Sequence, residues 1–172
     1  IARRRILWLL ILVLANGLTT KVIAMNDQIL KEIVLLAAFI PLLIGTGGNV
    51  GAQSSTVVIR GLSTQKLKSL GVFKAVIKEA ITGALLGILM IIVVFPFAWW
   101  QGEGPLIASA VGISLISITT LAATAGAILP LMFDKMGLDP ALMSSPFITT
   151  VTDIAGVFIY LSTANWLLNS SI

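Results

Sequence analysis

Long apolar runs, separated by short polar segments, are the dominant pattern along this chain. Polar residues gather at Asn26-Asp27, 60–74, 101–105 and 134–140, and almost everything between these segments is apolar. A bilayer core about 30 Å thick needs roughly 20 apolar residues per helix. The pattern therefore predicts five membrane-spanning helices, at about residues 6–25, 29–59, 75–100, 106–133 and 144–168.

The second and fifth of these runs have internal features that refine the prediction. The second run is longer than a bilayer requires, so it is expected to tilt, to kink at Pro41 or to extend past the lipid. The fifth run opens with Ser144-Ser145-Pro146, which is typical of a helix start with proline in the first turn.

The composition places the chain in a membrane. Of its 172 residues 58% are hydrophobic and only 10% are charged, whereas a soluble domain carries about 25% charged residues. We therefore expect an all-α membrane protein in which residues 1–172 form a single transmembrane domain of the plasma membrane, in contact with lipid. The chain contains no Cys and no His, which excludes the usual zinc sites and thiol or imidazole catalysis.

The basic residues indicate how the spans are oriented. With the N-terminus inside, only Lys21 and Lys31 lie outside, and this strong excess of basic residues in the inner segments predicts a cytoplasmic N-terminus and an external C-terminus. Topology accounts for the net charge of +4, so no nucleic-acid partner is expected. The inner basic residues are Arg3, Arg4, Arg5, Arg60, Lys66, Lys68, Lys74, Lys78 and Lys135.

The second span contains an unusual run of glycines and hydrogen-bonding side chains, from Gly45 to Thr56. Gly47 and Gly51 are four residues apart, which suits either a seam where another helix backbone comes close or a site that faces a ligand. Asn49 and Gln53 have the same spacing and share a helical face. Two carboxamides facing lipid would be costly, so this face is expected to be hydrated or to face a ligand.

The fifth span carries Asp153, the one acid placed well inside any predicted span. An Asp at the middle of a membrane costs at least about 2.5–3.5 kcal/mol on insertion scales, and no Lys or Arg lies at a similar depth to pair with it. One interpretation is a protonated Asp bonded to the hydroxyls of Thr149, Thr150 or Thr152. The other is a site for a cation.

A carboxylate among carbonyl and hydroxyl oxygens suits a hard cation such as Mg²⁺, which keeps several waters and binds through only one or two carboxylates. One acid does not neutralise a dication. Placing Asp153 next to a two-fold axis brings two carboxylates together, so we expect a homodimer with the pore at its axis.

Two separate motifs resemble the MgtE family of magnesium channels. The first runs from Pro41 through Gly45-Thr-Gly-Gly-Asn-Val-Gly-Ala-Gln-Ser54 to Arg60-Gly61. The second combines Leu138-Asp-Pro-Ala-Leu142, Ser145-Pro-Phe147 and Thr152-Asp-Ile-Ala-Gly156. The resemblance covers essentially the whole chain, with five spans in matching order.

The resemblance implies a homodimer with a central pore lined by the second and fifth spans. Asp153 would bind hydrated Mg²⁺, the transported ion, from both subunits, and Thr149 would contribute its backbone carbonyl. Asn49 would line or shape the pore, and Gln53, Gly48 and Gly156 are further candidates for lining it. The family's cytoplasmic sensor domains have no counterpart in this chain, and Arg3-Arg4-Arg5 would end a connecting helix.

These observations predict selective conduction of Mg²⁺ down its electrochemical gradient, to which an inside-negative potential adds about 4.6 kcal/mol per 100 mV for a dication. A proton- or sodium-coupled divalent cation exchanger that protonates Asp153 is an alternative. A membrane scaffold whose polar seam only packs helices is another. An enzyme is not expected, because Asp153 has no second acid or base close to it in the sequence.

Overall fold

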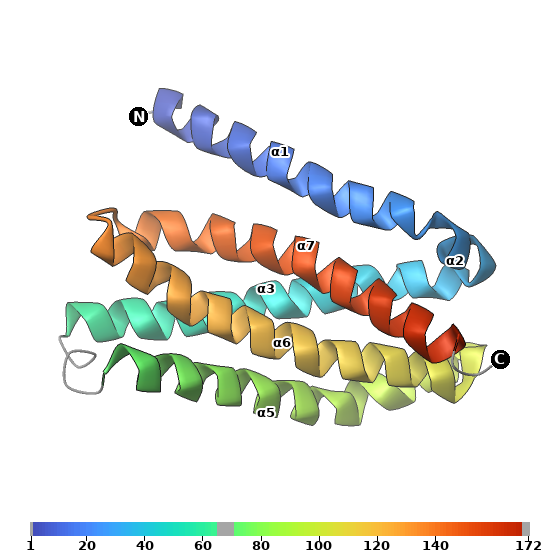
Figure 1. Ribbon diagram of the computed structural model, residues 1–172. Coiled ribbons are helices and arrows are strands. Elements are labelled where there is room, and N and C mark those ends of the chain that lie inside the picture. The colour runs from blue at the N-terminus through green and yellow to red at the C-terminus, as the bar shows by residue number, and fades with distance from the viewer. Residues whose placement is uncertain (1, 65–70, 170–172) are drawn as a thin grey trace.

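The computed structural model describes residues 2–64 and 71–169, and within these ranges the chain is helical apart from short turns, with no strand. The main helices run side by side as an elongated bundle (Figure 1). The elements in chain order are α1 (Ala2–Met25), α2 (Asp27–Glu32), α3 (Val34–Ser63), α5 (Val72–Ala98), the π-helical turn η1 (Trp99–Glu103), α6 (Gly104–Lys135) and α7 (Pro140–Asn169).

The all-α membrane class predicted from the sequence is confirmed. Four described helices are long and apolar enough to cross a bilayer, in the segments Val34–Ser63, Val72–Gln101, Gly104–Lys135 and Ser145–Asn169. The first predicted span lies in α1, whose apolar stretch Leu9–Met25 is shorter. α1 starts at one end of the bundle and α7 finishes at the other (Figure 1).

Several helix boundaries differ from the prediction. The second span is interrupted at Ile33, where φ is −129° and ψ is 83°, so the short helix α2 precedes α3. α3 then continues through Pro41 and past Arg60 to Ser63. Periodicity did not reveal the break, because Ile33 continues directly into the apolar start of α3 and the backbone changes direction without Gly or Pro.

The last helix also starts earlier than predicted. Pro140 is the first residue of α7, and the Ala141 backbone N–H donates to Asp139 Oδ1 at 2.9 Å, so Asp139 caps the helix. Gly137, with φ +70°, makes the turn that follows α6. Pro146 therefore lies inside the helix, although Ser144-Ser145-Pro146 resembles a start.

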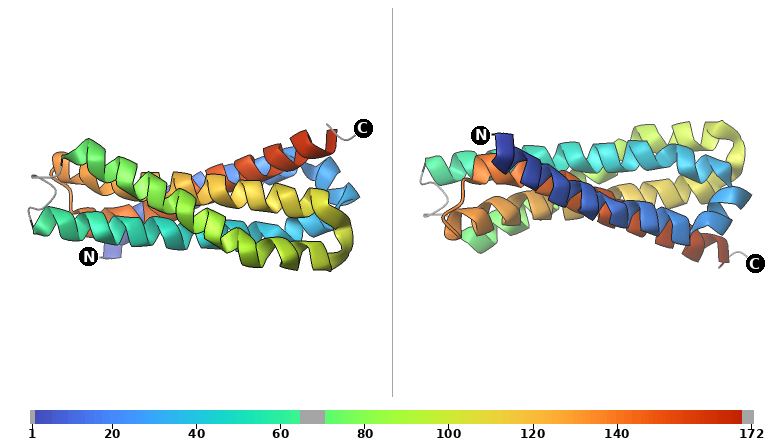
Figure 2. Two further views of the ribbon diagram at one scale, coloured as in Figure 1. Left: turned by 90° about the horizontal axis from the view of Figure 1, so that it is seen from below. Right: turned by 90° about the horizontal axis from the view of Figure 1, so that it is seen from above.

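α6 is the central helix, and α3, α5 and α7 all pack against it. α1 lies along α7 and crosses it obliquely, on the side of the bundle opposite α5 (Figures 1 and 2). α5 buries little beyond Gly83 and Gly87, which meet α6 at Thr119, and it exposes a long row of apolar side chains. Such a surface suits lipid, and the glycines let the two backbones come close.

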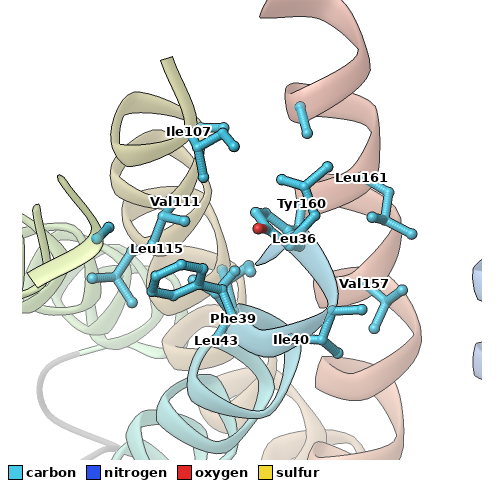
Figure 3. Close-up of a cluster of buried hydrophobic side chains, with 14 of the residues drawn as sticks. Leu36, Phe39, Ile40, Leu43, Ile107, Val111, Leu115, Val157, Tyr160 and Leu161 are labelled. Carbon is cyan, nitrogen blue, oxygen red and sulfur yellow. The ribbon is translucent and has the colours of Figure 1, made fainter. Parts of the chain in front are cut away.

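The buried core lies in the half of the bundle where α3 begins and α7 ends. Side chains from α3, α6 and α7 converge there (Figure 3). This packing holds α3 against α7 where α3 begins and α7 ends. Nearer the end of α3 and the start of α7, a groove opens between the two helices. Its fully buried members include Leu36, Leu43, Val111, Leu115, Tyr160 and Leu161.

Candidate functional site

One face of the polar run in α3 is packed against other helices. A β-carbon added at Gly47 would lie 2.5 Å from Thr152 Cγ2 of α7 and 2.6 Å from Ile118 Cγ2 of α6. One added at Gly51 would collide with Ile148 Cγ2 and lie 3.1 Å from the Ala122 carbonyl oxygen. Both glycines therefore serve as points of close helix approach, one of the two roles expected from their spacing.

The opposite face of the same run is open. Gly45, Asn49 and Gln53 are exposed and follow one another at four-residue intervals along α3. No described atom lies within 4 Å of the β-carbon position at Gly45. Asn49 and Gln53 thus share an exposed face, as their four-residue spacing predicts.

Asp153 lies on the flank of α7 next to this open face. Gly47 and Gly48 of α3 oppose Thr152 and Thr149 of α7, and this antiparallel register sets Asp153 level with residues 45–48. Thirteen residues separate Asp153 from the start of α7 and sixteen from its end. At 1.5 Å per residue it lies about 20 Å from the nearer end, so it is close to the middle of the helix.

The Asp153 side chain is half-buried and has no hydrogen bond or ion pair with any residue in the described part of the chain. Two of the three hydroxyls expected to stabilise a protonated Asp donate to carbonyl groups of their own helix. Thr152 Oγ1 donates to the Ile148 carbonyl at 2.6 Å, and Thr149 Oγ1 donates to the Pro146 carbonyl at 2.9 Å. Thr150 is buried.

A groove of about 460 Å³ extends from this region toward the end of the bundle where α3 ends and α7 begins. Ser145, one turn before Thr149, and Ala52, one turn after Gly48, contribute to its wall. Hydroxyl groups and one guanidinium supply the polar part of a lining that is mostly apolar. The groove is lined by Ala52, Ser55, Thr56, Ile59, Arg60, Ser63, Ala141 and Ser145.

The structure brings two of the predicted site residues, Gly48 and Thr149, next to each other and buries a third, Gly156. Thr149 is exposed, and its Cγ2 is 3.7 Å from the β-carbon position at Gly48. Gly156 is buried, with Ile44 and Ile118 at 3.5 and 3.7 Å from its β-carbon position. Its surroundings within one chain are those of a packing residue, and its role in a pore stays a prediction.

The groove residues were not named as site candidates from the sequence, although Ala52, Ser55 and Thr56 fall within the polar run from Gly45 to Thr56. The signal was present in Ser55, Thr56 and Ser63, but hydroxyls that bond back to their own helix are weak evidence of a site. Thr56 and Ser63 do bond back in this way. Among the described residues no group of three or more acids lies close enough to hold a metal ion.

Comparison with known proteins decides the family. Residues 40–163 match the family model MgtE, described as a divalent cation transporter. The chain belongs to the MgtE family. This match covers all of α5 and α6 and most of α3 and α7, the helices that build the bundle.

Three proteins named magnesium transporter MgtE are similar to this chain over nearly its whole length. The protein from Thermus thermophilus is 38% identical over 96% of the chain, and that from Enterococcus faecalis is 35% identical over 95%. The protein from Bacillus subtilis is 32% identical over 98%. The chain spans 37%, 36% and 38% of these relatives, so it corresponds to little more than a third of their length. Family membership and the long apolar helices identify it as a multi-pass membrane domain.

Proposed function

We propose that this MgtE domain forms the pore of a homodimeric channel that conducts Mg²⁺ across the plasma membrane, with Asp153 from both subunits binding the hydrated ion. The observation that carries the proposal is a half-buried carboxylate near the middle of α7 that no described residue neutralises. Such a group is costly in hydrocarbon and is tolerated where water and a cation reach it.

The open flank beside Asp153 supports a pore between two subunits. One carboxylate does not neutralise a dication, and each chain supplies a single acid at this depth. Apposition of two such flanks at a two-fold axis supplies two carboxylates, with the Gly48 backbone and the Thr149 carbonyl beside them. Asn49 and Gln53, on the exposed face of α3, line the approach to the ion.

The groove between α3 and α7 forms the inner part of the proposed path. The excess of basic residues in the inner segments supports a cytoplasmic N-terminus, which puts this groove on the cytoplasmic side and the end of α7 outside. The names of the three relatives support Mg²⁺ as the transported ion. Transport then follows the electrochemical gradient and needs no chemical step in the protein.

Mg²⁺ uptake into proteoliposomes tests the role of Asp153. We expect Asp153→Asn and Asp153→Ala to lower the uptake rate at least about tenfold, because an ion with strongly held water loses the charges that retain it. Asp134→Asn is the matched control, since Asp134 is an exposed acid at the end of α6. Its uptake should match the wild type.

The same assay separates conduction from the alternatives. Uptake that follows an imposed potential, without a proton or sodium gradient, supports a channel, whereas dependence on either gradient points to an exchanger. Wild-type uptake by folded Asp153→Asn protein would rule out the site. If neither the wild type nor any variant takes up Mg²⁺, and Asp153→Asn raises the thermal stability, the domain is a scaffold whose polar seam only packs helices.

A further inference from the structure

A second polar cavity lies about 35–40 Å along the bundle axis from the groove, under the bend between α1 and α2 and beside the last turns of α7. The estimate follows from the 24 residues between Ser145 and Asn169 at 1.5 Å each. The cavity has a volume of about 590 Å³. It is lined by Met25, Asn26, Gln28, Ile29, Glu32, Ile33, Asn165, Leu168 and Asn169.

Hydrogen bonds fix the direction in which its amide groups point. Asn26 Nδ2 donates to the Val22 carbonyl at 2.8 Å, and Asn165 Nδ2 donates to Asn26 Oδ1 at 3.2 Å. The amide nitrogens of both asparagines are therefore engaged with the protein. Asn165 Oδ1 accepts no hydrogen bond from the described residues. This chain of bonds ties the end of α1 to the end of α7.

A similar arrangement holds on α2. Gln28 Nε2 donates to Glu32 Oε1 at 3.2 Å, which leaves Gln28 Oε1 and Glu32 Oε2 without a described donor. Gln28, Glu32 and Asn165 thus each have one side-chain oxygen that accepts no hydrogen bond from the described residues. Carboxylate and carboxamide oxygens are the ligands preferred by hard cations.

Glu32 is the one acidic or basic side chain among the described residues that line the cavity. Lys31, the basic residue nearest in sequence, pairs with Asp27 one turn before it, and neither residue lines the cavity. Glu32 has no ion pair within the part of the chain that the structure describes. Six waters occupy about 180 Å³ in liquid, so the cavity has room for a cation with a complete first hydration shell.

We infer that this cavity binds a hydrated divalent cation through Glu32, Gln28 and Asn165, as a site separate from Asp153. Because α1 and α7 both end at it, the site lies at the outer mouth of the bundle in the proposed orientation. Binding there holds the α1–α2 bend to the end of α7 and raises the local concentration of the ion on that side.

Paramagnetic broadening by Mn²⁺ tests the site locally. The chain has no cysteine, so a nitroxide placed at Lys21→Cys, one turn before Met25, reports on the cavity without lining it. A label at Phe73→Cys, which is exposed near the start of α5, reports on binding elsewhere. Saturable loss of the signal is expected at position 21 and not at position 73. Absence of that loss would overturn the proposal.

Two matched acid substitutions, five residues apart, test the assignment. Glu32→Gln keeps the size of the side chain and removes the charge. It should raise the Mn²⁺ concentration at the midpoint of the titration at least tenfold. Asp27→Asn, on the same short helix but outside the cavity, should leave the midpoint within twofold. Equal midpoints for Glu32→Gln and the wild type would reject the site, because the cavity would then bind no cation through its carboxylate.

A third variant separates this inference from the function proposed for Asp153. In Asp153→Asn protein the response at position 21 should persist even where Mg²⁺ uptake is lost. Loss of the response in that variant would show that the label senses the pore ion, which would overturn the second site. Persistence of the response in protein that conducts no Mg²⁺ would support the cavity while the proposed function fails.

Discussion

The two faces of α3 have opposite surroundings although they come from the same short run of sequence. Gly47 and Gly51 are pressed against α6 and α7, while Gly45, Asn49 and Gln53 face away from the bundle. The packed face needs small residues because other backbones reach it. The exposed face needs polar residues because, in the proposed dimer, water and the ion reach it. Glycine therefore has two different surroundings in this helix: close packing at Gly47 and Gly51, and an open surface at Gly45.

The largest expected effect comes from filling the packed face. Gly51→Leu would drive a side chain into Ile148 of α7 and the Ala122 backbone of α6, so α3 would have to move away from both helices. Overpacking costs about 1–3 kcal/mol where side chains adjust, and more where backbone must move. We expect loss of monodisperse protein or a large fall in melting temperature, measured by size-exclusion chromatography and thermal unfolding in detergent. An unchanged melting temperature would contradict this packing.

A change on the exposed face should affect conduction and leave folding intact. Asn49→Ala removes a carboxamide that has no hydrogen bond to the described residues, so stability should change by no more than about 0.5 kcal/mol. Ion selectivity or conductance, measured as uptake of Mg²⁺ against Ca²⁺ in proteoliposomes, should change. Wild-type selectivity together with lower stability would make Asn49 a packing residue and remove the contrast between the faces.

The smallest effect is expected at the exposed glycine. Gly45→Ala adds a methyl group with no described atom within 4 Å, and it replaces glycine in a helix interior, which favours folding by about 0.5–1 kcal/mol. The melting temperature should rise slightly or stay the same. A marked fall would indicate that a second subunit packs closely on this face, which would sharpen the picture of the dimer interface.

The structure separates what helical periodicity predicts from what it does not. Spacing alone predicted that Asn49 and Gln53 share one face, and that Gly47 and Gly51 share another. It did not predict which face is packed, since a period of 3.6 gives only the angle between residues on one helix. The contacts of Gly47 with Thr152 and of Gly51 with Ile148 decided it, and they join segments about a hundred residues apart.

Residues that form a site by meeting from distant segments were the hardest to predict. The cavity at the α1–α2 bend combines residues 25–33 with residues 165–169, and nothing in either segment alone indicates the other. The bend at Ile33 contains no Gly or Pro that would predict it. This bend places Glu32 and Gln28 in the same cavity as the end of α7. The early start of α7 was readable from Asp139-Pro140, an N-cap followed by proline, but Ser145-Pro146 gave a competing start.

The sequence by itself determined the membrane class, the order of the helices and the presence of one acid deep in an apolar run, because these depend on hydrophobicity and length along one chain. Only the tertiary structure decided that α6 is central, that the glycine face of α3 is closed and that the flank beside Asp153 is open. Those outcomes depend on which helix surfaces fit together, and the fit is set by side-chain shape at contacts between segments far apart in the chain.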